Sequence, residues 1–197
     1  MRHPGVSIHR PFRPKWPLVF ALTPSEQSFA DQAEYKIDNQ ALIQALPEQV
    51  YDEFIGLENG LEWVKHLVRL DLLTPGAPPD RRIYDETWAF MTVRIRTVEA
   101  VRGRRWVGSI DNSSLPLSRQ MLQVVTFEPL PNGCTHFHWR LYYTPSLLAR
   151  PFLGGLQRAF EQMFRQDTEQ LAAFFRETRP AAASLVGLSS PEEPLLA

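Results

Sequence analysis

The last third of the chain, from Arg119 to Glu177, constrains the fold most. Two strand-like runs there are joined by Pro131-Asn132-Gly133, and a proline stop is followed by one long helix with an aromatic stripe. This order is typical of few architectures. It predicts a curved antiparallel sheet that grips a C-terminal helix around an apolar cavity, which suits a hydrophobic small molecule.

The final helix is predicted from Pro151 to Glu177. At 100° per residue its charged side chains fall on one side and its apolar side chains on the other. The helix is long enough to cross a whole domain. Its apolar face consists of Phe152, Leu153, Leu156, Phe160, Met163, Phe164, Leu171, Phe174 and Phe175.

The rest of the chain supplies a sheet and two short helices. Apolar alternation predicts a strand from Tyr35, and Pro47 then starts a helix that ends before Gly60. A second helix is predicted at Leu61 to His66. Six further strands are predicted at Leu67 to Thr74, Arg82 to Trp88, Thr92 to Ala100, Arg104 to Asp111, Met121 to Glu128 and Cys134 to Tyr143.

The sequence pattern divides the chain into three predicted regions. Residues 1–33 hold five prolines and little periodicity, so we expect an irregular extension that drapes over the domain or stays mobile. Residues 34–179 form one α+β domain, and residues 180–197 are predicted to be a flexible tail.

The composition argues against nucleic acid and membranes as binding partners. A net charge of −1 provides no field to attract nucleic acid, and no apolar run approaches the roughly 20 residues of a membrane span. The lone Cys134 excludes an internal disulfide framework, which favours a cytoplasmic protein. The basic N-terminus before the apolar run Trp16 to Leu22 leaves export open as the minor alternative. The sequence also leaves a homodimer open.

Several short stretches resemble the START-like superfamily, and its polyketide cyclase and lipid-transport branch in particular. They are Ala45-Leu46-Pro47-Glu48-Gln49-Val50-Tyr51, Phe127-Glu128-Pro129-Leu130, Asn132-Gly133-Cys134-Thr135, Tyr142-Tyr143-Thr144-Pro145 and Trp63. The resemblance covers about Glu34 to Arg179. It implies a helix-grip fold: seven antiparallel strands around the C-terminal helix, with two short helices between strands 1 and 2 closing the cavity. Members include cyclases and lipid carriers, so the fold does not fix the function.

Two amides are predicted to face the cavity. Asn39 shares an alternating strand face with Ile37 and Ile43, and Gln123 shares one with Met121. Polar groups on an apolar face need partners, so both amides are candidates for orienting a ligand. The alternative is that protein groups satisfy them.

Asp167 is the most unusual residue of the helix, because it falls within the apolar stripe. A buried carboxylate is costly unless it is paired or protonated. Asp167 is therefore either a ligand-facing acid and candidate catalytic residue, or an acid satisfied by a nearby arginine or hydroxyl.

The remaining predicted ligand contacts are apolar or aromatic, and each of them is equally compatible with an ordinary core position. They are Trp63, Trp88, Phe90, Trp106, Met121, Val125, Phe137, Trp139, Leu141, Leu156, Phe160, Met163 and Phe164.

Other chemistries lack support in the sequence. His136 and His138 share one strand face but should point outward, and no third metal ligand accompanies them. The arginines between Arg94 and Arg105 are interpreted as a solvated face. No nucleophile elbow or phosphate-binding loop is present, and we predict neither a metal nor a cofactor.

These observations favour a protein that binds an apolar ligand such as a lipid, polyketide, isoprenoid or aromatic metabolite, for transport, sequestration or sensing. One alternative is a cyclase or dehydratase in which Asp167 moves a proton with help from Tyr143 or Tyr35. A protein-interaction module that uses the convex sheet or the extension is a third hypothesis.

Overall fold

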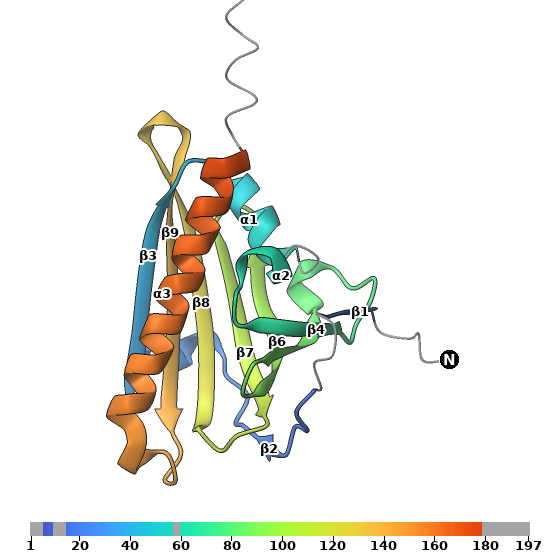
Figure 1. The fold of residues 1–197 in the computed structure, drawn as a ribbon, viewed down its shortest axis with the longest axis vertical. Helices are drawn as coiled ribbons and strands as arrows, with labels where there is room; N and C mark the ends of the chain where they lie inside the picture. Colours follow the sequence, from blue (N-terminus) through green and yellow to red (C-terminus); the bar gives the residue numbers. More distant parts are fainter. Residues whose placement is uncertain (1–5, 10–14, 57–59, 179–197) are drawn as a thin grey trace, which may run out of the picture.

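The computed structural model describes residues 6–9, 15–56 and 60–178, and it has the predicted helix-grip fold. Seven antiparallel strands curve around the C-terminal helix α3 (Leu153–Thr178), which crosses the face of the sheet in Figure 1. The strands are β3 (Tyr35–Ile43), β4 (Leu67–Leu72), β5 (Ile83–Trp88), β6 (Thr92–Val101), β7 (Arg105–Ser113), β8 (Ser118–Leu130) and β9 (Cys134–Pro145).

The strand order explains the shape of the sheet. Strands β4 to β9 pair with their neighbours in sequence, and β3 joins the far edge beside β9. Two short helices, α1 (Pro47–Ile55) and α2 (Gly60–Trp63), connect β3 to β4 and close one end of the concave face, as predicted.

The hairpin between β8 and β9 depends on its turn residues. Leu130 pairs with Cys134, so three residues make the connection. Asn132 and Gly133 have φ angles of 74° and 70°. Asparagine and glycine tolerate this left-handed region best, and for that reason this hairpin could be read from the sequence.

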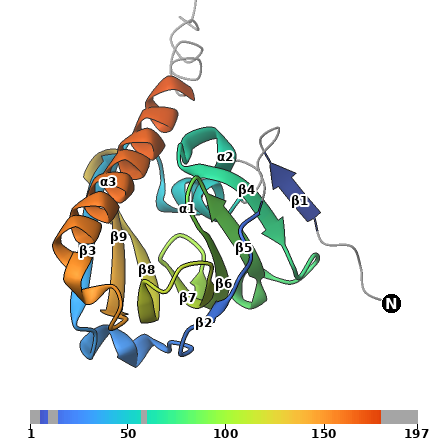
Figure 2. The same ribbon diagram turned by 60° about the horizontal axis from the view of Figure 1, so that its bottom comes forward.

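The segment before Glu34 adds structure that the sequence analysis did not predict. Strand β1 (Val6–His9) pairs with β4, and β2 (Phe20–Ala21) pairs with β7, which makes nine strands in the described residues. A short 3-10 helix, η1 (Gln27–Asp31), follows, and its Phe29 packs against Val107 and Val124. Figure 2 shows the part from β2 to η1 running along the bottom of the sheet, whereas β1 lies beside β4.

The start of the last helix also differs from the prediction. A 3-10 turn over Arg150–Phe152 precedes α3, and Phe152 is 73% exposed. The helical face assigned to Phe152 does not extend into this turn, so its side chain leaves the apolar stripe. The predicted tail of residues 180–197 lies outside the described residues.

Strand β9 alternates strictly between the core and the outer face. Thr135, Phe137, Trp139, Leu141 and Tyr143 are buried. His136 and His138 lie on the opposite face, where they contact Gln40 and Asp38 of β3. In the described part of the chain, no group of three potential metal ligands forms, and no helix has the length and hydropathy of a membrane span.

Candidate functional site: an aromatic cavity with two acids

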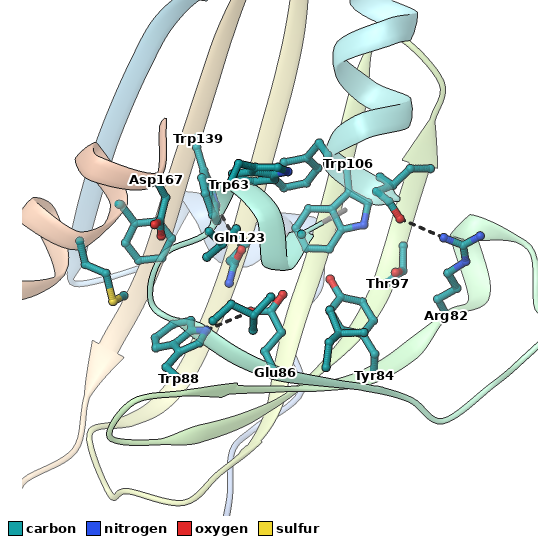
Figure 3. A pocket seen from close by; sticks show the side chains of 18 of the residues that line it. Trp63, Arg82, Tyr84, Glu86, Trp88, Thr97, Trp106, Gln123, Trp139 and Asp167 are labelled. Carbon is teal, nitrogen blue, oxygen red and sulfur yellow. Dashed lines mark hydrogen bonds between the residues drawn. The ribbon is translucent and has the colours of Figure 1, made fainter. Parts of the chain in front are cut away.

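A cavity lies between the concave face of the sheet, the two short helices and α3. Figure 3 shows its walls. Tryptophans dominate the lining, and four of the five in the chain contribute. The lining residues are Phe54, Ile55, Gly60, Trp63, Val64, Leu67, Leu70, Pro79, Arg82, Tyr84, Glu86, Trp88, Thr97, Trp106, Gln123, Trp139, Met163, Phe164 and Asp167.

Alternation along β5 places an acid inside this cavity. Tyr84, Glu86 and Trp88 point inward, because residues two apart share a face of a strand. Asp85 points to the other face, where Lys15 and Arg94 contact it at 2.5 and 2.8 Å. Two adjacent acids of one strand therefore occupy different environments.

A glycine makes room for Trp106. A Cβ atom on Gly108 would lie 2.3 Å from Cη2 of the Trp106 indole, a distance that real Cβ contacts do not reach. Gly108 is two residues along β7 and shares the inward face of that strand. The missing side chain lets the indole lie flat over the strand and form part of the wall.

Phe54 of α1 joins the aromatic walls. Its ring lies within 6.2 Å of five other rings, centroid to centroid, mostly in edge or tilted geometry. Such contacts favour a fixed arrangement of rings. The five partners are Trp63, Trp106, Phe127, Phe137 and Trp139.

One hydrogen bond orients the amide of Gln123. The indole N–H of Trp139 donates to Gln123 Oε1 at 3.1 Å. An indole nitrogen only donates, so the amide must present its oxygen to Trp139 and its nitrogen to the cavity. Gln123 is 2% exposed, and its Nε2 has no partner among the described residues.

Asp167 and Glu86 are the acids of the cavity. Asp167 is 3% exposed, and its Oδ1 has no partner in the described part of the chain. Burial and the Glu86 charge raise the pKa of Asp167 to about 7, against a smaller opposing effect of the Lys65 backbone amide. Burial also raises the pKa of Glu86 to about 7, although the Trp88 indole donates to its Oε2 at 3.3 Å.

The cavity is small, and an open groove adjoins it. The volume that the centre of a water-sized sphere can occupy inside is about 50 Å³, enough for a few waters or a compact chemical group. By the same measure the groove offers about 320 Å³. Met163 lines both spaces. The groove is otherwise lined by His66, Phe90, Leu156, Ala159, Phe160, Gln162 and Gln166.

The structure brings half of the predicted ligand contacts together in the cavity: Trp63, Trp88, Trp106, Gln123, Trp139, Met163, Phe164 and Asp167. It places Phe90, Leu156 and Phe160 in the adjoining groove. Met121, Val125, Phe137 and Leu141 are buried in the core but do not line the cavity.

Three predicted polar residues lie elsewhere. Asn39 lines a polar groove between β3 and α3, because the helix lies over β3 and separates Asn39 from the cavity. Tyr35 and Tyr143 stack at a centroid distance of 5.6 Å and do not line the cavity. Neither tyrosine is therefore placed to assist Asp167.

Glu86 and Phe54 were missed as site residues by the sequence analysis. A signal for Glu86 was present. Trp88 was assigned to the cavity, and a residue two positions earlier on the same strand shares its face. No comparable signal existed for Phe54, because helical periodicity shows that a face is buried but not what it is buried against.

The matching family is described as "Polyketide cyclase / dehydrase and lipid transport", and the match spans residues 34–176. The chain belongs to this family. The match begins where the sequence predicted the domain to begin, and it includes every residue that lines the cavity. Among curated proteins, none matches the sequence of this family member.

Solved structures support the same fold for this family member. The Zhui aromatase/cyclase of Streptomyces sp. R1128 aligns with a TM-score of 0.65 and 11% identity, over 76% of this chain and 98% of that one. The protein XoxI of Bacillus cereus aligns with a TM-score of 0.58 and 18% identity, over 73% and 96%. A START superfamily protein of Mycobacterium smegmatis aligns with a TM-score of 0.53 and 10% identity, over 69% of this chain and 98% of that one.

Proposed function

We propose that this protein binds a hydrophobic small molecule whose polar end enters the aromatic cavity and whose apolar part lies in the adjoining groove. The observation that carries the proposal is the lining. Four tryptophans surround a few convergent polar atoms, the composition that small-molecule sites share.

The sizes of the two spaces support a ligand in two parts. The cavity alone suits a compact group, whereas the groove has room for an apolar segment of several carbons. Met163 lies between them, and an unbranched methionine adjusts its shape at low cost. Burial of apolar surface at roughly 25 cal/mol per Å² would supply most of the affinity.

Native mass spectrometry of the purified protein tests this proposal, with denaturing extraction to identify any bound molecule. We expect a hydrophobic molecule at one-to-one stoichiometry. A matched control is Met163→Trp, which fills the junction of cavity and groove and should abolish the bound mass. An unliganded spectrum, together with no thermal shift from a panel of lipids and polyketides, contradicts the proposal.

The two acids favour a second candidate, a cyclase or dehydratase. With pKa values near 7, one carboxylate can take a proton from a carbon beside a carbonyl group, while the other carboxylic acid protonates a hydroxyl that leaves as water. The test is turnover of a poly-β-keto thioester. We expect Asp167→Asn and Glu86→Gln each to abolish it, whereas Glu161→Gln on the exposed face of α3 retains it. Unchanged turnover in Asp167→Asn removes Asp167 from the mechanism.

A further inference from the structure

Neither of the two acids in the cavity is paired with a cation in the part of the protein that the structure describes. The titratable groups that line it are Arg82, Tyr84, Glu86 and Asp167. Among the described residues, neither Glu86 nor Asp167 forms an ion pair. Asp167 Oδ1 is also buried without a hydrogen-bond partner. An uncompensated buried acid is costly, which indicates that something else completes this pair.

Arg82 does not supply the missing charge. It immediately precedes β5 in extended backbone and is four residues from Glu86, so their Cα atoms are about 13 Å apart at the rise of a β-strand. Tyr84 lies between them in Figure 3, and the Arg82 guanidinium donates to the Ile55 carbonyl oxygen at 3.1 Å. The Arg82 guanidinium therefore lies at the far end of the cavity from Glu86 and is bonded to the backbone there.

Asp85 shows what the fold does with a buried acid that has a structural role. Its side chain is fully buried on the other face of β5, and it is bonded to both Lys15 and Arg94. Glu86 is its immediate neighbour and has neither. The difference indicates that the positive charge that pairs with the cavity acids comes from a bound molecule.

The walls of the cavity suit an organic cation. Tryptophan faces attract ammonium groups more strongly than other aromatic faces do, and quaternary ammonium ions are bound by cages of such rings. Trp63, Trp88, Trp106 and Trp139 surround the space that Glu86 and Asp167 enter. Its small volume matches a compact headgroup.

We propose that the polar end of the ligand is a small alkylammonium cation, held by Glu86, Asp167 and the surrounding indole faces. This inference rests on the proposed binding function and names the chemistry of the ligand. The free Gln123 Nε2 donates to an acceptor near the cation, such as a hydroxyl group, because its orientation is fixed by Trp139.

Choline and its uncharged isostere 3,3-dimethylbutan-1-ol provide the test, since they share shape and hydroxyl and differ in charge. Binding is measured at pH 8 by calorimetry and tryptophan fluorescence. We expect choline to bind at least tenfold more tightly than the alcohol. The double variant Glu86→Gln, Asp167→Asn should lose this preference, whereas the exposed Glu161→Gln should keep it. Circular dichroism and thermal melting verify that the variants are folded.

The same experiment at pH 6 adds a second readout. Protonation of Glu86 and Asp167 removes the negative charge, while burial holds the pKa of Tyr84 well above this range. We therefore expect choline affinity, but not affinity for the alcohol, to fall several-fold from pH 8 to pH 6.

Two results overturn the inference. Equal affinity for choline and the alcohol shows that the cavity does not select a cation and leaves the proposed binding function intact. Binding of neither compound also refutes the alkylammonium assignment, and the co-purified mass then decides the binding function independently.

Discussion

Trp139 donates its indole N–H to Gln123 Oε1 at 3.1 Å, and this bond decides which end of the Gln123 amide faces the cavity. The consequence is a free amide donor in the cavity that Glu86 and Asp167 also line. Both residues lie on the inward face of neighbouring strands, where Gln123 of β8 pairs with Leu141 and Val125 pairs with Trp139. The bond therefore links diagonal positions of the hairpin.

Removing the indole donor should destabilise the protein. Trp139→Phe leaves Gln123 Oε1 buried without its donor, and Trp63→Phe is the matched control, since the buried indole N–H of Trp63 has no partner among the described residues. We expect Trp139→Phe to cost about 1 to 2 kcal/mol more than Trp63→Phe in urea unfolding. Equal losses would mean that the hydrogen bond contributes no net stability.

Stability of the unliganded protein should fall as pH rises. The pKa values of Asp167 and Glu86 are raised from 3.8 and 4.5 to about 7 by folding, so the folded state retains protons that the unfolded state releases. The resulting stabilisation is complete below about pH 4 and is lost as pH rises through 7. We expect a lower Tm at pH 8 than at pH 5. Other groups also titrate over this range, so the double variant Glu86→Gln, Asp167→Asn is the comparison, and its pH dependence should be weaker.

Asp167 and Asp85, both buried, should respond oppositely to neutralisation. Asp167→Asn removes an uncompensated charge, and we expect it to stabilise the protein by about 1 to 3 kcal/mol at pH 8. Asp85→Asn removes the partner of Lys15 and Arg94 and should destabilise it by a similar amount. Chemical denaturation of both variants at pH 8 measures the difference, and a loss of stability in Asp167→Asn would contradict the view that its charge is uncompensated.

Gly108 should not tolerate a methyl group. An alanine there forces the Trp106 indole away from β7 and into the cavity, at a cost of more than about 1 kcal/mol. Gly154→Ala is the control, because a Cβ on this residue of α3 meets open space and favours the helix by about 0.5 to 1 kcal/mol. Thermal melting and ligand titration report both effects, and unchanged melting and binding in Gly108→Ala would show that Trp106 has room to move.

Lys15 should anchor the N-terminal segment to the sheet. It contacts Asp85 at 2.5 Å and Asp71 at 3.1 Å, and both aspartates are buried. We expect Lys15→Ala to cost about 1 to 3 kcal/mol in chemical denaturation. Lys36→Ala, which breaks an exposed pair with Asp38, should cost less than about 1 kcal/mol. Similar small losses would show that Arg94 and Arg69 satisfy the aspartates alone.

The fold could be predicted from the sequence because its seven long strands and three helices have clear periodicity and explicit turns. The pairing of Phe20 and Ala21 with β7 could not, since two residues carry no period and their partners lie more than 90 positions away. Within the site, alternation placed Gln123 and Trp139 correctly on the inward face. The same rule did not show that α3 covers β3, which removes Asn39 from the cavity.

The packing of the N-terminal segment on the outer face of the sheet has a consequence for the order of folding. Ser25 bonds to Ser109, 84 residues away, and to the Met121 carbonyl, 96 residues away, so these contacts need β7 and β8 to be in place first. Closing such long loops is slow compared with forming the local β8–β9 hairpin. The segment around Ser25 is therefore among the last parts of the domain to find its place, although it precedes both of its partner strands in the sequence.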